Sequence, residues 1–255
     1  MTARFSGQTA LVTGAASGIG LATARGLAAR GVARLILVDL DAAGLNQARD
    51  SITNANVAVH AGDVADEGLW DALAPELAGL DLAVINAGIA GAAPIADLAF
   101  AEWRRILSVN LDGAFLTLRA AMRAMRGRGG AITLTASASG VKAEPGVAAY
   151  GASKAALIHL ARIAAKEGAP DGIRVNAIAP GGVETPVWRD VPFFADLVAR
   201  TGSEAAAFAE MGRMATPLGR YASADEIAGQ IAFLLSDAAA TITGTTLLAD
   251  GGYTL

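Results

Sequence analysis

The sequence predicts an α/β protein built on a doubly wound, Rossmann-type parallel sheet of seven strands, with helices on both faces. Three observations lead to this prediction. Short apolar runs alternate with longer runs rich in Ala, Leu and Arg along the chain. Several short runs are continuously apolar, as expected of strands buried on both faces of a parallel sheet. A glycine-rich segment directly follows the first of these runs.

The alternation places the elements in chain order. The expected strands are Thr9–Thr13, Leu35–Asp39, Val57–His60, Leu82–Ile85, Ala131–Thr135, Ile173–Ile178 and Thr245–Leu248. The expected helices lie between them, at Gly18–Arg30, Asp41–Ile52, Glu67–Leu77, Ala101–Met125, Val147–Lys166 and Ala224–Leu235. Each strand–helix–strand unit should form a right-handed crossover. Because no repeat or linker divides the chain, residues 1–255 are expected to form one domain.

The segment 186–216 fits the alternation poorly. It contains Trp188, Phe193 and Phe194 among small and charged residues. A long insertion of this kind is often a lid, because such a segment must move to admit a substrate. We interpret it as a substrate lid; the alternative is a helical excursion that only covers the sheet.

The composition argues against several classes of protein. Of the 255 residues, 53 % are hydrophobic and 17 % are charged, and the net charge of −4 comes without a basic block, so a nucleic-acid partner is not expected. The longest uncharged stretch, Leu82–Ala96, is too short and too interrupted by Gly and Pro to span a bilayer. The segment Met1–Gly7 has no apolar signal region, so a cytoplasmic location without membrane attachment is expected.

Metal and disulfide chemistry are also not expected. The chain has no cysteine, which excludes disulfides and thiolate ligands. Its two histidines, His60 and His159, form no metal-binding pattern and are interpreted as packing or surface residues.

The glycine-rich segment Thr13–Gly20 has the features of a dinucleotide-binding loop. Glycines let the backbone turn sharply and approach a pyrophosphate, and the following helix N-terminus offers free N–H groups and a partial positive charge. The segment lies between a strand and a helix, which is the context that the motif requires. The residues expected to contact the cofactor are Gly14, Ser17, Gly18, Ile19 and Gly20.

Asp39 indicates which dinucleotide is bound. It ends the second strand, 19 residues after Gly20, where a carboxylate can accept hydrogen bonds from both ribose hydroxyls and would repel a 2′-phosphate. Positions 17 and 40 are Ser and Leu, so no neighbouring cation would attract that phosphate. NAD is therefore expected, and NADP is disfavoured. The alternative role for Asp39, a helix N-cap, suits Asp41 better.

Two further motifs follow expected strands. Asp63-Val64 comes after the third strand, where a carboxylate can reach an adenine amino group, and Asn86-Ala87-Gly88 comes after the fourth. Open α/β sheets bind ligands at the carboxyl ends of their strands, so both are candidate cofactor contacts. Either could instead be ordinary turn chemistry, because Asp and Asn are common turn residues.

Tyr150 and Lys154 form the clearest candidate for chemistry. They are four residues apart, so on a helix both side chains lie on one face. An ammonium about 4 Å from a phenol would lower the phenol pKa by about three units at an effective dielectric near 20, before desolvation. Such a tyrosine can exchange a proton with a hydroxyl or carbonyl. The alternative is a half-buried tyrosine beside a solvated lysine.

Taken together, the motifs resemble those of the short-chain dehydrogenases/reductases, in the branch where one domain is the whole subunit. The resemblance covers essentially the full length. It rests on Thr13–Gly20, Asp63-Val64, Asn86-Ala87-Gly88, Asn110, Ser137, Tyr150/Lys154, Pro180-Gly181 and Asp250-Gly251-Gly252. It implies an Asn–Ser–Tyr–Lys tetrad, and Asn110, Ser137, Tyr150 and Lys154 occur in that order with the usual gaps of 27, 13 and 4. Residues 132–136 and Ile85 depart from many relatives, which limits assignment to a subgroup.

The resemblance also implies a role for each residue. Tyr150 would be the general acid/base, and Lys154 would lower the pKa of Tyr150 and hold the nicotinamide ribose. Ser137 would stabilise charge on the substrate oxygen, and Asn110 would hold a water that links Lys154 to solvent. Residues 180–185 would hold the nicotinamide carboxamide, with Pro180, Gly181, Val183 and Thr185 as contacts. The single domain is thus expected to bind the dinucleotide and carry the catalytic residues.

The expected reaction is NAD-dependent interconversion of a secondary alcohol and a ketone. Candidate pocket residues are Ala138, Glu144, Val147, Val187 and Trp188, which suggest a substrate with a substantial apolar part. Glu144 is the one charged candidate and could instead be a solvated loop residue. The substrate itself, the stereoselectivity and the cellular direction cannot be predicted.

The resemblance also implies a homotetramer. Small and apolar residues on the expected helix Val147–Lys166, and the apolar tail Leu247–Leu255, would suit subunit interfaces, although both could pack within one chain. Two other functions remain open. One is a 3-ketoacyl-thioester reductase of fatty-acid synthesis, disfavoured by Asp39, and the other is a non-catalytic NAD sensor, disfavoured by the presence of both Tyr150 and Lys154.

Overall fold

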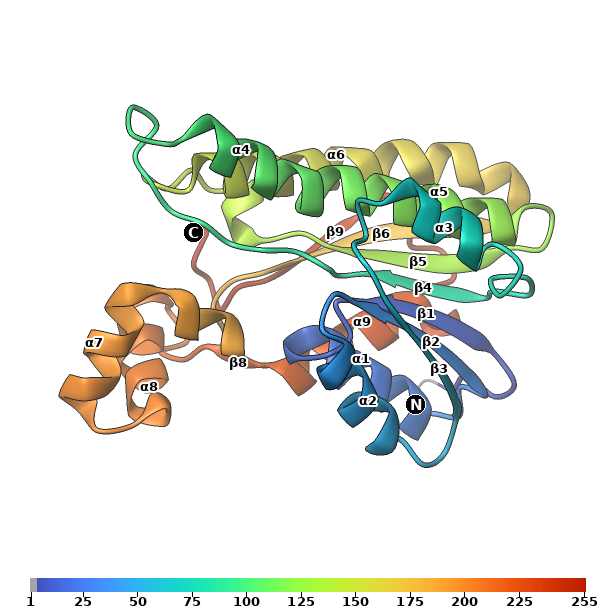
Figure 1. The fold of residues 1–255 in the computed structure, drawn as a ribbon, viewed down its shortest axis with the longest axis horizontal. Coiled ribbons are helices and arrows are strands. Elements are labelled where there is room, and N and C mark those ends of the chain that lie inside the picture. Colours follow the sequence, from blue (N-terminus) through green and yellow to red (C-terminus); the bar gives the residue numbers. More distant parts are fainter. Residues whose placement is uncertain (1–3) are drawn as a thin grey trace.

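Seven parallel strands form the central sheet, in the order β3-β2-β1-β4-β5-β6-β9 (Figure 1). The computed structural model describes residues 4–255; Met1, Thr2 and Ala3, part of the N-terminal segment considered above, lie outside the described residues. The strands are β1 Thr9–Thr13, β2 Arg34–Asp39, β3 Asn56–Ala61, β4 Leu82–Ile85, β5 Gly130–Thr135, β6 Ile173–Pro180 and β9 Thr246–Ala249. The order reverses between β1 and β4, which makes the carboxyl ends of these two strands a switch point where ligands bind. The predicted doubly wound sheet is confirmed.

Helices cover both faces of the sheet. They are α1 Gly18–Ala29, α2 Ala42–Asp50, α3 Glu67–Leu73, α4 Phe100–Leu107, α5 Gly113–Met125, α6 Ala148–Gly168, α7 Pro192–Thr201, α8 Glu204–Ala215 and α9 Ala224–Leu235. Figure 1 shows α3 to α6 on one face of the sheet and α1, α2 and α9 on the other, with α7 and α8 standing beside it. Within residues 4–255, no helix is long and apolar enough to cross a membrane.

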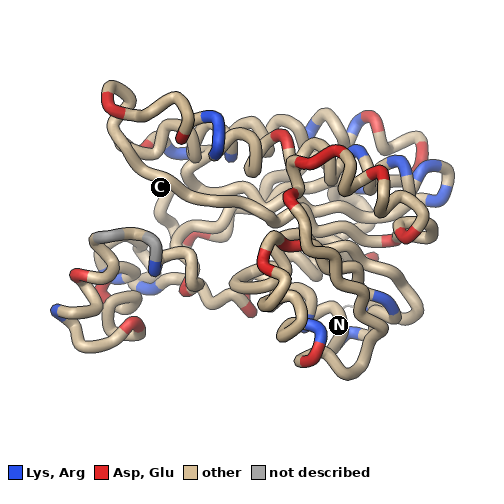
Figure 2. The backbone as a smooth tube through the Cα atoms, in the orientation of Figure 1, with Lys and Arg blue, Asp and Glu red and all other residues tan. Residues whose placement is uncertain are grey.

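Two hydrophobic clusters fill the space between the sheet and its helices. Neighbouring residues of β1 point to opposite faces, so Leu11 joins one cluster with Trp70 and Val12 joins the other with Leu27. A third, smaller cluster lies within the α7–α8 part, where Phe194 and Phe208 pack at a ring-centroid distance of 4.8 Å. Charged residues of both signs are interspersed over the helices and loops of the described chain (Figure 2).

The predicted helix Ala101–Met125 is interrupted. A five-residue π-turn, Ser108–Asp112, separates α4 from α5, and the amide of Gly113 bonds to the carbonyl of Ser108. The predicted helix Glu67–Leu77 ends at Leu73, just before Pro75, because proline has no N–H to continue the ladder.

The ends of the segment 186–216 are held together by a small second sheet that the sequence did not indicate. Strand β7, Val183–Glu184, pairs in parallel with β8, Ala222–Ser223. Between them lie a short 3₁₀ turn, Pro186–Asp190, and then α7 and α8, which pack on each other. The segment is therefore helical and has a core of its own.

Candidate active site

The predicted site residues gather at the carboxyl edge of the sheet. The glycine loop follows β1, Asn86 follows β4, Ser137 follows β5, and Pro180 ends β6. Because these strands are parallel neighbours, their carboxyl ends open onto the same edge. The loop after β4, at Gly88, and the loop after β5, at Gly140, therefore approach α6, which carries Tyr150 and Lys154.

The glycine loop forms a tight cradle that requires glycine. Gly14 and Gly18 have positive φ angles of 64° and 53°. A Cβ atom at Gly14 would lie 2.8 Å from Asn86 Nδ2, and one at Gly20 would overlap the carbonyl oxygen of Gly14. The Ser17 side chain makes no capping hydrogen bond to α1, which leaves the first-turn amides to an anion. This arrangement fits the pyrophosphate of a dinucleotide.

Asn86 joins the ends of β1 and β4. Its Nδ2 donates to the Thr13 carbonyl at 3.1 Å, and Thr13 Oγ1 accepts from the amides of Asn86 and Ala87 at 3.0 and 3.1 Å. Gly88 in the same loop lies beside two of the predicted site residues, since a Cβ there would lie 3.2 Å from Lys154 Nζ and 3.3 Å from Asn110 Oδ1. Sequence reasoning included Thr13 in the glycine-rich motif but did not identify its hydroxyl as the group that joins the two strand ends.

Asp39 is held in place beside the glycine loop. Its Oδ2 accepts from the Ala16 amide at 2.9 Å, and its Oδ1 accepts from the Asp41 amide at 3.0 Å. Asp41, and not Asp39, caps α2 through the amides of Ala43 and Gly44. The adjacent Leu40 is 76 % exposed and carries no charge. The fixed carboxylate suits an unphosphorylated adenosine ribose.

Asp63 and Val64 serve the local structure as well. Asp63 Oδ1 accepts from the Ala65 amide at 2.9 Å, which is the turn chemistry of the alternative interpretation. Val64 is buried, and a Cβ atom at Gly113 would lie 2.5 Å from its Cγ2, so the start of α5 packs directly on it. The Asp63 carboxylate keeps lone pairs for a further donor.

Ser137, Tyr150 and Lys154 meet between β5 and α6. The Ser137 hydroxyl lies close enough to the phenol of Tyr150 to lower its pKa. Lys154 is 4 % exposed, donates from Nζ to the Thr135 carbonyl at 2.9 Å, and lies 5.7 Å from the centre of the Tyr150 ring. The structure therefore brings the predicted acid/base, its hydroxyl partner and its cation together.

The pKa values differ from the sequence expectation. Burial raises the pKa of Tyr150 above its usual value, and the neighbouring Ser137 hydroxyl only partly offsets this effect. Burial also lowers the pKa of Lys154 to about 8. The expected lowering of the Tyr150 pKa by Lys154 is thus wrong for the cofactor-free protein. The ammonium is bonded to the Thr135 carbonyl, and desolvation of the phenolate dominates.

Asn110 is fully buried in the π-turn between α4 and α5. Its Oδ1 accepts from the Ile89 amide at 2.8 Å, and its Nδ2 donates to the Ile89 carbonyl at 3.0 Å and to Ser153 Oγ at 3.1 Å. Ser153 Oγ in turn donates to the Tyr150 carbonyl at 2.7 Å. Both amide N–H groups are occupied by protein, so one Oδ1 lone pair is left for the water of the expected proton path.

The loop after β6 closes against the glycine loop. Thr185 Cγ2 lies 3.4 Å from the position that a Cβ would take at Gly18, and Thr185 Oγ1 donates weakly to the Val183 carbonyl at 3.4 Å. Gly181 passes against the backbone of Asp250. The predicted nicotinamide contacts Pro180, Gly181, Val183 and Thr185 therefore lie beside the predicted pyrophosphate site.

The candidate pocket residues fall into two groups. Ala138, Glu144 and Val147 lie on the loop between Ser137 and α6, whereas Val187 and Trp188 lie on the 3₁₀ turn before α7. The Trp188 ring stacks on Tyr221 at a centroid distance of 5.8 Å and donates from Nε1 to the Val183 carbonyl at 2.9 Å. Glu144 is paired with Lys142, whose Nζ lies 3.6 Å from Glu144 Oε1.

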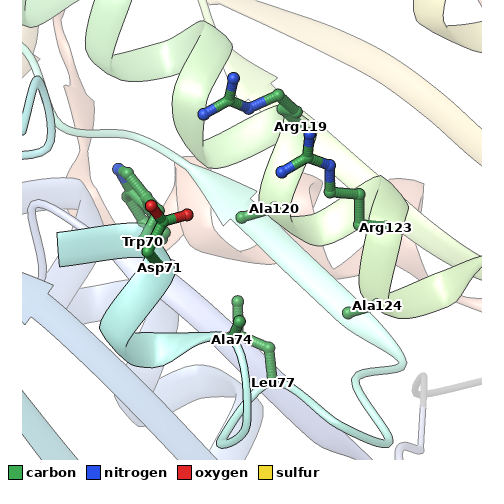
Figure 3. A pocket seen from close by; sticks show the side chains of 8 residues that line it. All are labelled: Trp70, Asp71, Ala74, Leu77, Arg119, Ala120, Arg123 and Ala124. Carbon is green, nitrogen blue, oxygen red and sulfur yellow. The ribbon is translucent and has the colours of Figure 1, made fainter. Parts of the chain in front are cut away.

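Two surface cavities lie away from these residues. One, of about 190 Å³, lies between α3 and α5; Figure 3 shows Trp70 and Asp71 on the first helix facing Arg119 and Arg123 on the second. Another, of about 370 Å³, lies between α5 and α6 beside Phe115 and Ile163. Neither is lined by a predicted site residue, so the candidate site remains the open carboxyl edge of the sheet.

Comparison with known proteins adds independent information. Residues 14–254 match a family model described as enoyl-(acyl carrier protein) reductase. The cis-4-hydroxycyclohexanecarboxylate dehydrogenase of Sinomonas cyclohexanicum is 40 % identical over 261 residues, which cover 98 % of each chain. A short-chain type dehydrogenase/reductase of Mycobacterium marinum is 35 % identical with a TM-score of 0.86, over 98 % of this chain and 97 % of that one. Carveol dehydrogenase of Mycobacterium avium, in complex with NAD, is 28 % identical with a TM-score of 0.89, over 99 % of both chains.

These matches agree with the geometry of the carboxyl edge. The family model and the relatives each span nearly the whole chain, and two of the named proteins are dehydrogenases. A neighbour with bound NAD supports a nicotinamide cofactor, which the cradle of Gly14 and Gly20 fits. The chain belongs to the short-chain dehydrogenase/reductase family of oxidoreductases.

Proposed function

We propose that this protein is an NAD(H)-dependent dehydrogenase that interconverts a secondary alcohol and a ketone. The observation that carries the proposal is the meeting of Ser137, Tyr150 and Lys154 beside the glycine cradle. A relative of 40 % identity is named for a hydroxycyclohexane carboxylate, whose ring bears a secondary hydroxyl. That name supports a secondary alcohol as the class of substrate.

The residues of the chain divide the work of the reaction. When bound, the nicotinamide supplies or accepts the hydride. Tyr150 exchanges a proton with the substrate oxygen, and Ser137 hydrogen-bonds the same oxygen where charge develops. Lys154, with its pKa near 8, is largely protonated at neutral pH and places positive charge beside the phenol. Because the Tyr150 pKa is raised, the neutral phenol is a ready proton donor for ketone reduction, whereas alcohol oxidation should speed up with rising pH.

The proposed cofactor is NAD rather than NADP. The Asp39 carboxylate is fixed by two amides at the end of β2, where it can accept from the adenosine ribose hydroxyls. A 2′-phosphate there would face that negative charge beside the uncharged, exposed Leu40. The NAD-bound neighbour supports the same choice.

We further propose that the segment 186–216 is the substrate lid. The β7–β8 pair holds its two ends together, and α7 and α8 share a small core. Val187 and Phe193 leave exposed apolar surface on this segment, 45 % and 51 % exposed, which a substrate with an apolar part could cover. The subunits are proposed to form a homotetramer, in part through the groove beside Phe115 and Ile163.

The test is NADH formation by the purified protein and by Tyr150→Phe. Each is assayed with NAD and with NADP on a panel of secondary alcohols, and NAD binding is followed by tryptophan fluorescence as the control for folding. The proposal expects turnover with NAD that falls at least about 100-fold in Tyr150→Phe, while NAD binding is kept. Reduction of a 3-ketoacyl thioester with NADPH alone would favour the reductase alternative. Tight NAD binding with no turnover in either direction would favour the sensor.

A further inference from the structure

The chain after β9 folds back over the carboxyl edge of the sheet. Asp250 fixes this turn, because its Oδ1 accepts from the Gly252 amide at 3.0 Å and its Oδ2 accepts from the Thr254 amide at 3.0 Å and hydroxyl at 2.7 Å. The Gly251 carbonyl accepts from the Leu218 amide at 3.1 Å. Figure 1 shows the C-terminus lying between the α4 side of the molecule and the α7–α8 pair. The tail thus runs along the base of the proposed lid.

Tyr253 on this tail meets the loop that leads from Ser137 to α6. Lys142 Nζ donates to the Tyr253 carbonyl at 2.9 Å and lies 4.2 Å from the centre of its ring. The same Nζ lies 3.6 Å from Glu144 Oε1. Burial, and then the neighbouring Glu144 carboxylate, raise the pKa of Tyr253 well above its usual value, so the phenol stays neutral. Lys142, Glu144 and Tyr253 are called the tail cluster below.

The tail cluster lies next to the candidate pocket. The Lys142 amide bonds to the carbonyl of Ala138, the residue after Ser137, at 2.8 Å. On the lid side, a Cβ atom at Gly251 would lie 3.3 Å from Cβ of Thr216, the last residue of the segment 186–216. The cluster therefore lies on the loop that carries the first group of candidate pocket residues, and its tail reaches the end of the proposed lid segment.

The charges of the tail cluster define which group it would accept. The ammonium of Lys142 and the carboxylate of Glu144 offset each other, and their side chains keep 40 % and 33 % of their surface exposed. A carboxylate on the substrate would be repelled by Glu144, and an ammonium by Lys142. A hydroxyl fits, because it can donate to the Glu144 carboxylate and accept from a phenol or ammonium.

We propose that Glu144 and Tyr253 form a polar wall of the substrate pocket that selects alcohols bearing a second hydroxyl group. The inference rests on the proposed alcohol dehydrogenase activity and narrows its substrate to diols or polyols. Glu144 accepts a hydrogen bond from the second hydroxyl group of the substrate, and the neutral phenol of Tyr253 lies beside this contact. Tyr253 is thus a specificity residue in a tail that contains none of the predicted catalytic residues.

The experiment compares kcat/KM for matched sets of alcohols. Each set contains a simple secondary alcohol, its analogue with a second hydroxyl, and its analogue with a carboxylate. The proteins are wild type, Tyr253→Phe, Glu144→Gln and, as a control on the same tail, Leu255→Ala, whose side chain is 99 % exposed. Tyr253→Phe keeps the ring over Lys142, so folding is preserved, and NAD binding checks this point.

The proposal expects wild type to prefer the hydroxylated analogue. Each of the two variants should lower the kcat/KM of the hydroxylated analogue about tenfold, mainly through KM, and change that of the simple alcohol less than about twofold. Glu144→Gln removes the charge of the acceptor, and Tyr253→Phe removes the phenol beside it. Leu255→Ala should match wild type. Equal losses for all members of a set, or a wild-type preference for the carboxylate, would overturn the inference and leave the dehydrogenase proposal standing. If wild type oxidised no member of any set, the dehydrogenase proposal would fail, and the inference with it.

Discussion

Replacing Asn110 by alanine is expected to destabilise the protein by about 3 kcal/mol. The side chain is fully buried and makes three hydrogen bonds, two to the backbone of Ile89 and one to Ser153 Oγ. Alanine would leave the amide and carbonyl of Ile89 without these partners. An unpaired polar group costs about 1 to 3 kcal/mol when it is buried. Because Ile89 is only partly buried, the lower bound is taken for each of the three lost bonds, which gives about 3 kcal/mol.

Urea unfolding of the cofactor-free protein, followed by circular dichroism at equal protein concentration, measures this loss. For a chain of this size the melting temperature should fall by about 6 °C or more. The control is Ser153→Ala, which removes one of the three Asn110 bonds together with the bond from Ser153 to the Tyr150 carbonyl, and it should destabilise the protein by about 2 kcal/mol. In the double variant the two effects should not add, with a coupling of about 0.5 to 1 kcal/mol. A loss below about 1 kcal/mol in Asn110→Ala would refute the view that these bonds hold the π-turn in place.

Three further predictions follow from the geometry. Because the Lys154 pKa is lowered to about 8, wild-type stability without cofactor should rise from pH 8 to pH 10, and urea unfolding of Lys154→Met should lack this slope. Asp39→Ala should raise KM for NAD about tenfold and shrink the preference over NADP; an unchanged ratio of kcat/KM values would contradict the assignment. Arg174→Met should lower the free energy of unfolding by about 2 to 4 kcal/mol, because four backbone carbonyls lose a charged donor, among them those of Leu234 and Leu235 at the end of α9. An unaltered melting temperature would exclude this role.

Much of the fold follows from local patterns. Buried runs such as Leu82–Ile85 have a clear strand signal, and the cradle at Gly14 and Gly20 needs glycine for reasons visible in the sequence. The order of motifs places them at one edge of the sheet once the strands are taken as parallel. The doubly wound sheet and the family were therefore within reach of sequence reasoning.

The parts that were missed depend on contacts between distant residues. The π-turn at Ser108–Asp112 accompanies the bonds of Asn110 to Ile89, 21 residues away, and the sequence of the turn itself reads as an ordinary helix. Spacing placed Lys154 near Tyr150 correctly, yet the direction of the Tyr150 pKa depends on burial, which spacing does not reveal. Tyr253 meets Lys142 across 111 residues, so no local signal could have found it.

The third hydrophobic cluster gives the α7–α8 part a separate level of cooperativity. Phe194 and Phe208 pack within it, whereas Leu11 and Val12 belong to the clusters on either face of the sheet. Amide hydrogens in α7 and α8 should therefore exchange through a local opening, at a lower free energy than those of the central strands. Weakening the Phe194–Phe208 contact would speed exchange in these two helices alone. The proposed lid would then open at a rate that can be tuned without weakening the clusters on the two faces of the sheet.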